Sequence, residues 1–173
     1  MSRVEAWLDG PVNGVPPLLM PVAHALIQAH RDVERVAADL TVEELWARPN
    51  GAAAVGFHLR HMAGSTDRLV TYARGVPLTG EQRAAIELEG VPGTPPAQAA
   101  ELLAGIDGAV ETALAVLRQT PEAALLQFRG VGKAQRPSDV LGLLAHAGQH
   151  AQRHAGQVIT TVRILRGAEP HAR

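Results

Sequence analysis

Apolar side chains recur three or four residues apart through four long segments, and this spacing constrains the fold of the chain more than any other feature. The segments cover about residues 17–40, 53–74, 96–119 and 139–166, and stretches that contain Pro and Gly separate them. In the first segment, the predicted inward stripe consists of Val22, Leu26, Ala29, Val33, Val36 and Leu40. No stretch sustains the two-residue alternation of a strand. The sequence therefore predicts an all-α fold, a four-helix bundle.

Short elements are expected around these helices. Thr41 and Glu44 have the spacing of a capping box, which predicts a short helix that ends near residues 48–51. Residues 1–16 contain several Pro and Gly, and we expect an irregular N-terminal segment there. A chain of this length commonly forms one domain, so residues 1–173 are expected to share one core.

Two longer connections are less regular. The connection after the second predicted helix is polar, and its clearest break is the Pro-rich stretch 91–96. About 16 residues before Pro137 form the least regular connection, and a short strand or turn is expected at about 125–131. The fourth helix then begins after Ser138 or Asp139, either of which can cap it.

Composition and charge exclude several classes of function. The net charge is −1 and no basic run occurs, whereas a nucleic-acid-binding face needs clustered Lys and Arg. The chain has no Cys, so any thiol chemistry needs a thiol from a substrate, and the absence of Cys fits the cytoplasm.

The start of the chain does not have the apolar core of a signal peptide, because it is interrupted by Arg3, Glu5 and Asp9. Prolines break the uncharged stretch 10–30. We expect a cytoplasmic protein that contacts neither nucleic acid nor membranes.

Five of the eight histidines fall in two short helical windows. His146, His150 and His154 repeat every four residues in the last predicted helix, so neighbouring rings project one turn apart. His58 and His61 lie three residues apart in the second predicted helix. Both windows interrupt apolar stripes, and buried imidazoles need partners, which one divalent cation supplies to three of them. The sequence therefore predicts a metal site between these helices.

Three neutral imidazoles, with a fourth position left to water or substrate, form the ligand pattern of a catalytic zinc. Nickel, iron and cobalt accept the same nitrogens, and we expect zinc or nickel. The alternatives for the five clustered histidines are a solvated polar helix face and a histidine-rich dimer interface. The other three histidines are expected at surface or satisfied core positions: His24, His30 and His171.

The two histidine windows resemble those of the DinB superfamily of helical-bundle metalloproteins. The first motif is His58-Leu-Arg-His61-Met-Ala-Gly, and the second is His150-Ala-Gln-Arg-His154-Ala-Gly-Gln157. The order of the helices and the long connection before the fourth helix also agree, so the resemblance covers nearly the whole chain. It implies a four-helix bundle of up-down-down-up order with short extra helical turns in the connections, and a homodimer.

The resemblance also implies a set of site residues. Its motifs place the metal ligands at His61, His150 and His154. The neighbours of the site, which would contact a ligand or a substrate, are then His58, His146 and Gln157.

The helical period favours a different choice in the second helix. At 100° per residue, His58 lies about 60° from Val55 on the inner face, whereas His61 lies about 120° away. Periodicity therefore favours His58, and the motif favours His61. In the last helix, His146 with His150 is the pair that competes with His150 and His154.

The function implied by the resemblance is that of a metal-dependent enzyme that activates a low-molecular-weight thiol for transfer to an electrophile. The arginines that are candidates for attracting an anionic thiol are Arg60, Arg68 and Arg153. One alternative is a metal-dependent hydrolase that activates water. Another is a module without catalysis, a dimer in the stress response in which the metal joins two helices.

Overall fold

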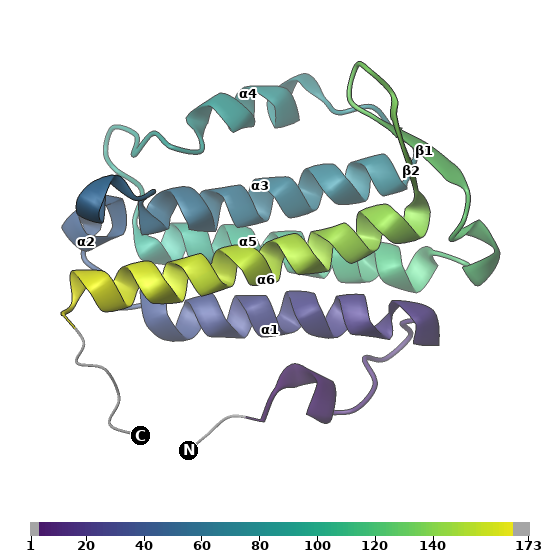
Figure 1. Cartoon of the computed structure of the whole chain (residues 1–173), viewed down its shortest axis with the longest axis horizontal. Helices are drawn as coiled ribbons and strands as arrows, with labels where there is room; N and C mark the ends of the chain where they lie inside the picture. Colours follow the sequence, from purple (N-terminus) through teal and green to yellow (C-terminus); the bar gives the residue numbers. More distant parts are fainter. Residues whose placement is uncertain (1–3, 168–173) are drawn as a thin grey trace.

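The structure is a computed structural model that describes residues 4–167, and most of these residues are helical. Four long helices lie side by side along the molecule (Figure 1). Their bounds are Met20–Ala37 for α1, Val55–Ala73 for α3, Ala99–Gln119 for α5 and Val140–Leu165 for α6. They correspond to the four segments with helical spacing, so the prediction of a mainly helical fold is confirmed.

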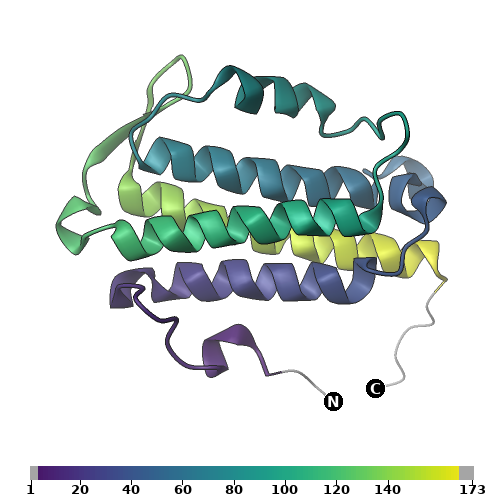
Figure 2. The same ribbon diagram turned by 180° about the vertical axis from the view of Figure 1, so that it is seen from behind.

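Two of the four long helices run in each direction along the molecule. Helices α1 and α6 run one way, and α3 and α5 run the other way (Figure 1). Helix α6 packs against both α1 and α3 on one side, and α5 packs against both on the other side (Figure 2). The two helices that carry the histidine windows, α3 and α6, are therefore antiparallel neighbours.

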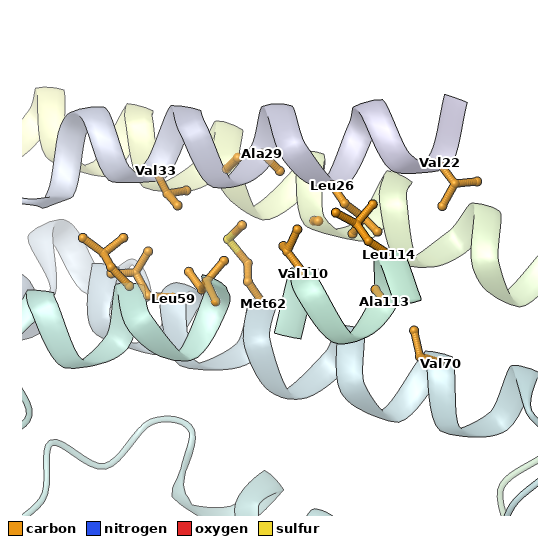
Figure 3. Packing of buried hydrophobic residues seen from close by; sticks show 14 of the residues in the cluster. Val22, Leu26, Ala29, Val33, Leu59, Met62, Val70, Val110, Ala113 and Leu114 are labelled. Carbon is orange, nitrogen blue, oxygen red and sulfur yellow. The ribbon is translucent and has the colours of Figure 1, made fainter. Parts of the chain in front are cut away.

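The core consists of the predicted apolar stripes. Figure 3 shows Leu26 and Val33 of α1 facing Leu59 and Met62 of α3, with Val110 of α5 beside them. Each of these side chains is buried. Full burial of one such side chain stabilises the folded chain by about 1.5–3 kcal/mol. Because the stripes meet in one core, the positions of α3 and α6 are fixed by packing rather than by the histidines.

Small residues allow α1 and α6 to pack closely. Gly148 of α6 is buried, and a Cβ at this position would lie 3.0 Å from the Cβ of Ala25 and 3.5 Å from the carbonyl oxygen of Val22. Such a contact is tighter than ordinary van der Waals packing. The glycine therefore sets the spacing of the two helices two residues before His150.

Two short helices occupy the connections on either side of α3. Helix α2, Val42–Trp46, has the predicted capping box: the Thr41 side chain accepts from the backbone of Glu44, and the Glu44 side chain accepts from Thr41. The polar connection after α3 contains a nine-residue helix, α4, Gly80–Leu88, where only short helical turns were expected. It begins with a second capping box, formed by Thr79 and Gln82. No residue of α4 is buried, so the helix lacks the apolar stripe that would reveal it in the sequence.

A β-hairpin precedes α6. Strand β1, Phe128–Val131, lies within the region where a strand or turn was expected, and β2, Arg136–Asp139, was not predicted. The strands are antiparallel, with Phe128 opposite Asp139. The Asp139 carboxylate then accepts from the backbone of Gly142 and caps α6.

The N-terminal segment has little regular structure but is attached to the core. The backbone N–H of Ala6 donates to Oε1 of Gln28 over 2.8 Å, and Val15 belongs to the core. The described residues contain 3₁₀ turns at Ala6–Leu8, Pro17–Leu19, Pro49–Gly51 and Glu122–Ala124. Arg3 and His171, which entered the sequence analysis, lie outside the described residues. Within residues 4–167, none of the helices combines the length and apolar character needed to cross a membrane.

Candidate metal centre

Four histidines face one another across the contact between α3 and α6. Nε2 of His61 lies 2.8 Å from Nε2 of His150, and Nδ1 of His58 lies 3.0 Å from Nδ1 of His154. The two pairs are arranged as the antiparallel helices require, because the earlier residue of α3 meets the later residue of α6. Both sequence windows therefore contribute to a single cluster.

Three of these rings form a group that can hold a metal ion. One ring nitrogen each from His61, His150 and His154 lies within 4.8 Å of the other two. The ring centroids are 4.6 Å apart for His61 and His154, and 4.5 Å apart for His150 and His154. His58 contributes to the cluster through His154. The structure thus brings together the three residues named by the motif, and it places the residue favoured by periodicity directly behind them.

Exposure rises from one side of the cluster to the other. His58 and His154 are buried, with 5% and 8% of their surface exposed. The side chain of His61 is 21% exposed, and His150 is half-buried. His146 is exposed, with its ring centroid 5.4 Å from that of His150. The cluster is therefore closed on the His58 side and reaches solvent on the His61 side.

A buried carboxylate holds the ring of His61. Oε2 of Glu89 lies 2.7 Å from Nδ1 of His61, and Oε1 of Glu89 accepts from Arg68 over 2.8 Å. Glu89 is buried, and it directly follows α4. Gly64 provides room for this contact, because a Cβ there would lie 2.8 Å from an Arg68 nitrogen and 3.0 Å from Oε1 of Glu89. Histidine ligands in metalloproteins commonly donate their other ring nitrogen to such a carboxylate.

These contacts determine which nitrogens are free. Because the carboxylate of Glu89 can only accept, Nδ1–H of His61 donates to it, which leaves Nε2 of His61 facing Nε2 of His150. When Nδ1 of His154 carries its proton, it donates to Nδ1 of His58, and Nε2 of His154 keeps a lone pair. Glu89 and His58 thus each accept a hydrogen bond from Nδ1 of a different ring, that of His61 and that of His154.

The environment of the cluster keeps its inner rings neutral. Burial, followed by repulsion from His61 and His146, lowers the pKa of His150 to about 4. Burial, followed by repulsion from His61 and His150, lowers the pKa of His154 to about 3. Burial also lowers the pKa of His58. A neutral imidazole is the form that binds a metal, so these rings need no deprotonation near neutral pH.

The pKa of Glu89 is set by opposing effects. Burial is the largest single effect and raises the pKa, but the hydrogen bonds from His61 and Arg68, together with charge attraction from the same two residues, lower it below the ordinary value. Glu89 is therefore a carboxylate near neutral pH. Its negative charge lies against His61 and compensates part of the charge that a cation would bring into this region.

The residues present fit a divalent cation. Nδ1 of His150 is buried and has no hydrogen-bond partner within the described chain, which is costly unless the ring gains a partner. The donor set consists of imidazole nitrogens, which zinc and nickel accept.

The ring of Phe57 is stacked on that of His61, with a centroid distance of 5.4 Å. Phe57 and Glu89 thus fix His61 from two sides.

Several predicted neighbours lie away from the cluster. Gln157 and Arg153 are exposed, and Gln157 makes no hydrogen bond to the histidines within residues 4–167. The guanidinium of Arg60 donates to the carbonyl oxygens of Leu88 and Val91 and lies over the Trp46 ring. Arg60 thus holds the end of α4 through neutral acceptors, whereas the charge of Arg68 is compensated by Glu89.

The remaining described histidines are also separate from the cluster. Nε2 of His24 lies 2.9 Å from the carbonyl oxygen of Gly10, and Nδ1 of His30 lies 4.0 Å from Asp107. Both rings thus have local polar partners, as expected for histidines outside the site.

Sequence reasoning missed Glu89 and Phe57. Glu89 is one of several acidic residues in a polar stretch, and only the folded position of α4 distinguishes it from the exposed Glu87. Phe57 did carry a signal, because an aromatic residue directly before His58 and four residues before His61 can cover a ring on the same helix face.

A cavity of about 330 Å³ adjoins the carboxylate side of the cluster. Its lining includes Glu89, which contacts His61, together with Arg60 and apolar residues at the end of α4. The three-histidine group is therefore separated from this cavity by the side chain of Glu89.

At the coarsest level, the fold and the site describe a helical protein with a three-histidine group suited to a metal. More specifically, the chain belongs to the DinB superfamily, whose family model matches residues 25–158. This match covers more than half of the chain and includes both histidine windows. It confirms the resemblance that the windows indicated.

A solved structure supports the same assignment at the level of the fold. The chain is similar to a structure described as a conserved protein from Enterococcus faecalis, with 22% sequence identity and a TM-score of 0.67. The similarity covers 84% of this chain and 95% of that one. At this identity the likeness concerns the fold alone. No curated protein matches the chain at a significant level.

Proposed function

We propose that the chain binds one divalent cation, zinc or nickel, through His61, His150 and His154. The observation that carries the proposal is the convergence of three imidazole nitrogens within 4.8 Å, with His61 held by a buried carboxylate. Two residues support these ligands by hydrogen bonds to their Nδ1 atoms: Glu89 contacts Nδ1 of His61, and His58 contacts Nδ1 of His154. This pattern is typical of metal sites, in which an outer partner orients each ring.

The proposed activity is the transfer of a low-molecular-weight thiol to an electrophile. A divalent cation in this group would supply Lewis acidity that keeps a thiol as a thiolate near neutral pH. The chain itself has no Cys, so the thiol is a co-substrate. Glu89 and Phe57 hold His61 in one orientation, and the partial exposure of His61 leaves an approach for a substrate.

The solvent-accessible side of His61 favours an enzyme over a purely structural metal site. A metal that only joins two helices is commonly enclosed by four protein ligands. Here the group consists of three histidines, and one of them has a side chain that is 21% exposed. The cavity next to Glu89 offers room for part of a substrate.

The proposal also includes the wider setting of the site. The directions and contacts of the long helices support a four-helix bundle of up-down-down-up order. The absence of Cys supports a reducing, cytoplasmic compartment. A homodimer is supported by large apolar side chains that are more than half exposed near the start of the chain, namely Trp7, Leu8 and Leu18.

Elemental analysis of the untagged protein by mass spectrometry tests the metal site. We expect about one zinc or nickel ion per chain, as three-histidine sites hold one ion, and none in His150→Ala/His154→Ala. His146→Ala is the matched control, since its exposed ring comes from the same helix and should leave the metal content unchanged. A wild-type protein that stays empty after incubation with both ions overturns the proposal.

The activity needs a second experiment on the metal-loaded protein. Bacillithiol, mycothiol and glutathione are each incubated with 1-chloro-2,4-dinitrobenzene, and release of chloride is followed. Metal-dependent release that requires a thiol supports the transferase. Metal-dependent hydrolysis of a nitrophenyl ester without a thiol supports the hydrolase instead, and a loaded protein that is inert in both assays favours a structural metal.

A further inference from the structure

A second cavity lies at the opposite end of α3 from the histidines. It has a volume of about 810 Å³ and is bordered by the end of α3, the connection to α4, α4 itself and the β1–β2 hairpin. Figure 1 shows the hairpin reaching over this end of the molecule. Its size is within the range of about 300–1,000 Å³ that is typical of small-molecule sites. We call it the hairpin groove.

The hairpin groove is separate from the candidate metal centre. Tyr72 lines the groove, and it lies eleven residues after His61 in the same helix. At 1.5 Å per residue, the two positions are about 16 Å apart along the helix axis. A ligand in the groove would therefore lie well away from the histidine cluster.

Large apolar side chains form one part of the groove and are only partly covered. Val76 and Ile86 are each 43% exposed, and Phe128 is 64% exposed. They come from three different elements: the connection after α3, α4 and β1. Isolated exposed apolar residues are common, but a group of them around one cavity is typical of a binding site.

The charged side chains that line the groove are all cationic. They are Arg83 from α4, Arg129 from β1 and Lys133 from the hairpin turn, and no Asp or Glu lines the groove. Within residues 4–167, none of the three forms an ion pair with a carboxylate. Lys133 is also the single lysine in the sequence. The charge of this cavity is therefore positive and uncompensated, although the chain as a whole carries −1.

One of these cations is held in place by the fold. Nε of Arg129 donates to the carbonyl oxygen of Ala73 over 2.8 Å, at the end of α3. Gly75 follows the C-cap of α3, its φ of +73° suits glycine, and a Cβ there would lie 3.3 Å from Nε of Arg129. The acceptors of Arg129 are neutral, so its charge stays available while its position is fixed. Such preorganisation reduces the entropy cost of binding an anion.

We propose that the hairpin groove binds a small organic anion with an apolar ring system. The carboxylate or similar head group of this ligand meets Arg83 and Lys133, and its rings lie against Phe128, Ile86 and Val76. The proposal follows from the combination of apolar walls and uncompensated cations in one cavity. A neutral apolar ligand would leave these cations unused, and a cationic ligand would be repelled by them.

Calorimetric titration of the full chain with a matched pair of probes tests the charge preference. The probes are 1-naphthoate and 1-naphthylmethylammonium, which share the ring system and differ in the sign of the charge. We expect naphthoate to bind at least about tenfold more tightly, because three like charges favour it, each by up to about 1 kcal/mol. Acetate, which has the head group alone, should not bind measurably. Equal affinity for both probes, or no binding of naphthoate, overturns the proposal.

Variants of groove residues locate the binding site. Arg83→Gln and Lys133→Gln should each weaken naphthoate binding about two- to fivefold, the effect of one partly exposed charge. Arg163→Gln, an exposed arginine near the end of α6, is the control and should have no effect. Phe128→Ser should also weaken binding, whereas Leu126→Ser should not, because Leu126 is 81% exposed and lies outside the groove lining. Equal effects of groove and control variants contradict the assignment.

The two candidate sites must also be distinguished from each other. The affinity for naphthoate is measured for metal-free protein, for zinc-treated protein and for His150→Ala/His154→Ala. The same affinity in all three assigns the anion to the hairpin groove, whatever the outcome of the metal analysis. Loss of naphthoate binding in the histidine variant would mean that the anion binds at the histidine cluster, and the groove proposal would be wrong.

Discussion

Oε2 of Glu89 lies 2.7 Å from Nδ1 of His61, and this contact connects the end of α4 to the histidine cluster of α3 and α6. The other carboxylate oxygen is held by Arg68, so Glu89 is fixed at both oxygens. The contact selects the tautomer of His61 and leaves its Nε2 facing His150. The proposed metal centre therefore depends on a residue that is itself no proposed ligand.

Replacing the carboxylate should weaken the metal centre without removing it. We expect Glu89→Gln to lower the affinity for zinc by about 10–100-fold, the usual effect of losing an outer partner of a histidine ligand. The affinity is measured by competition with a chromophoric chelator at a temperature where both proteins are folded. Glu87→Gln, an exposed change two residues earlier, is the control. Equal zinc affinity of wild type and Glu89→Gln would show that the carboxylate does not support the site.

The two histidines of α3 should differ in their importance for metal binding. His61→Ala removes a proposed ligand, whereas His58→Ala removes only the partner of His154. We therefore expect His61→Ala to abolish stoichiometric binding and His58→Ala to reduce affinity by about 10–100-fold. Metal content and zinc competition measure both effects. If His58→Ala is the more harmful change, the helical period identified the ligand and the motif did not.

The metal-free protein should lose stability as the pH falls below 6.5. The pKa values of His150 and His154, about 4 and about 3, lie below the ordinary value of 6.5 that they regain on unfolding. Between these values the unfolded chain binds protons that the folded chain does not, so acid favours unfolding. The contribution is complete above pH 6.5 and is lost as the pH falls toward 4 and then 3. Each ring contributes at most about 1.4 kcal/mol per pH unit.

Urea denaturation of the metal-free protein at about pH 7, 6 and 5 measures this dependence. These conditions avoid Glu89, whose lowered pKa makes its contribution fall only below the ordinary value of 4.5. His150→Asn/His154→Asn should show a flatter dependence on pH than the wild type, and His146→Asn should not. Parallel pH profiles for all three proteins would contradict the assigned cause.

Two glycines of α6 should respond in opposite ways to the same substitution. Gly156 has open space around a Cβ, so Gly156→Ala should stabilise the protein by about 0.5–1 kcal/mol through the helix backbone. At Gly148 a Cβ would press on Ala25, and overpacking costs about 1–3 kcal/mol, more than the backbone gain. Urea denaturation compares the free energies of unfolding. A stabilising Gly148→Ala would show that α1 and α6 can separate freely.

Much of the scaffold could be predicted because its signals are local. The long helices bury one face each, so their apolar residues recur at the helical period, as Val22, Leu26 and Val33 do in α1. The capping box at Thr41 likewise needs only neighbouring residues. Helix α4 has an equivalent capping box but buries no residue, and β2 contains Pro137 and polar residues. Neither element has an apolar pattern that would indicate it.

The site could be predicted in part, for a related reason. Periodicity correctly indicated that His58 is more buried than His61, but it describes one helix at a time. His61 is covered by Glu89 and Phe57 and meets α6 from the flank of α3, and such contacts depend on how the helices pack. The partnership with Glu89 joins positions 28 residues apart through an exposed helix. No local pattern contains that information.

Because Glu89 lies in a connection, the stability of the fold and the orientation of His61 depend on different segments of the chain. The long helices provide the stability of the fold through Leu26, Leu59 and their neighbours, whereas the orientation of His61 depends on a segment that buries almost nothing else. Substitutions or changes of length between α3 and α5 can therefore alter the reactivity of the centre while the core stays intact. In evolution or in the laboratory, this connection is the place where new chemistry can arise at little thermodynamic risk.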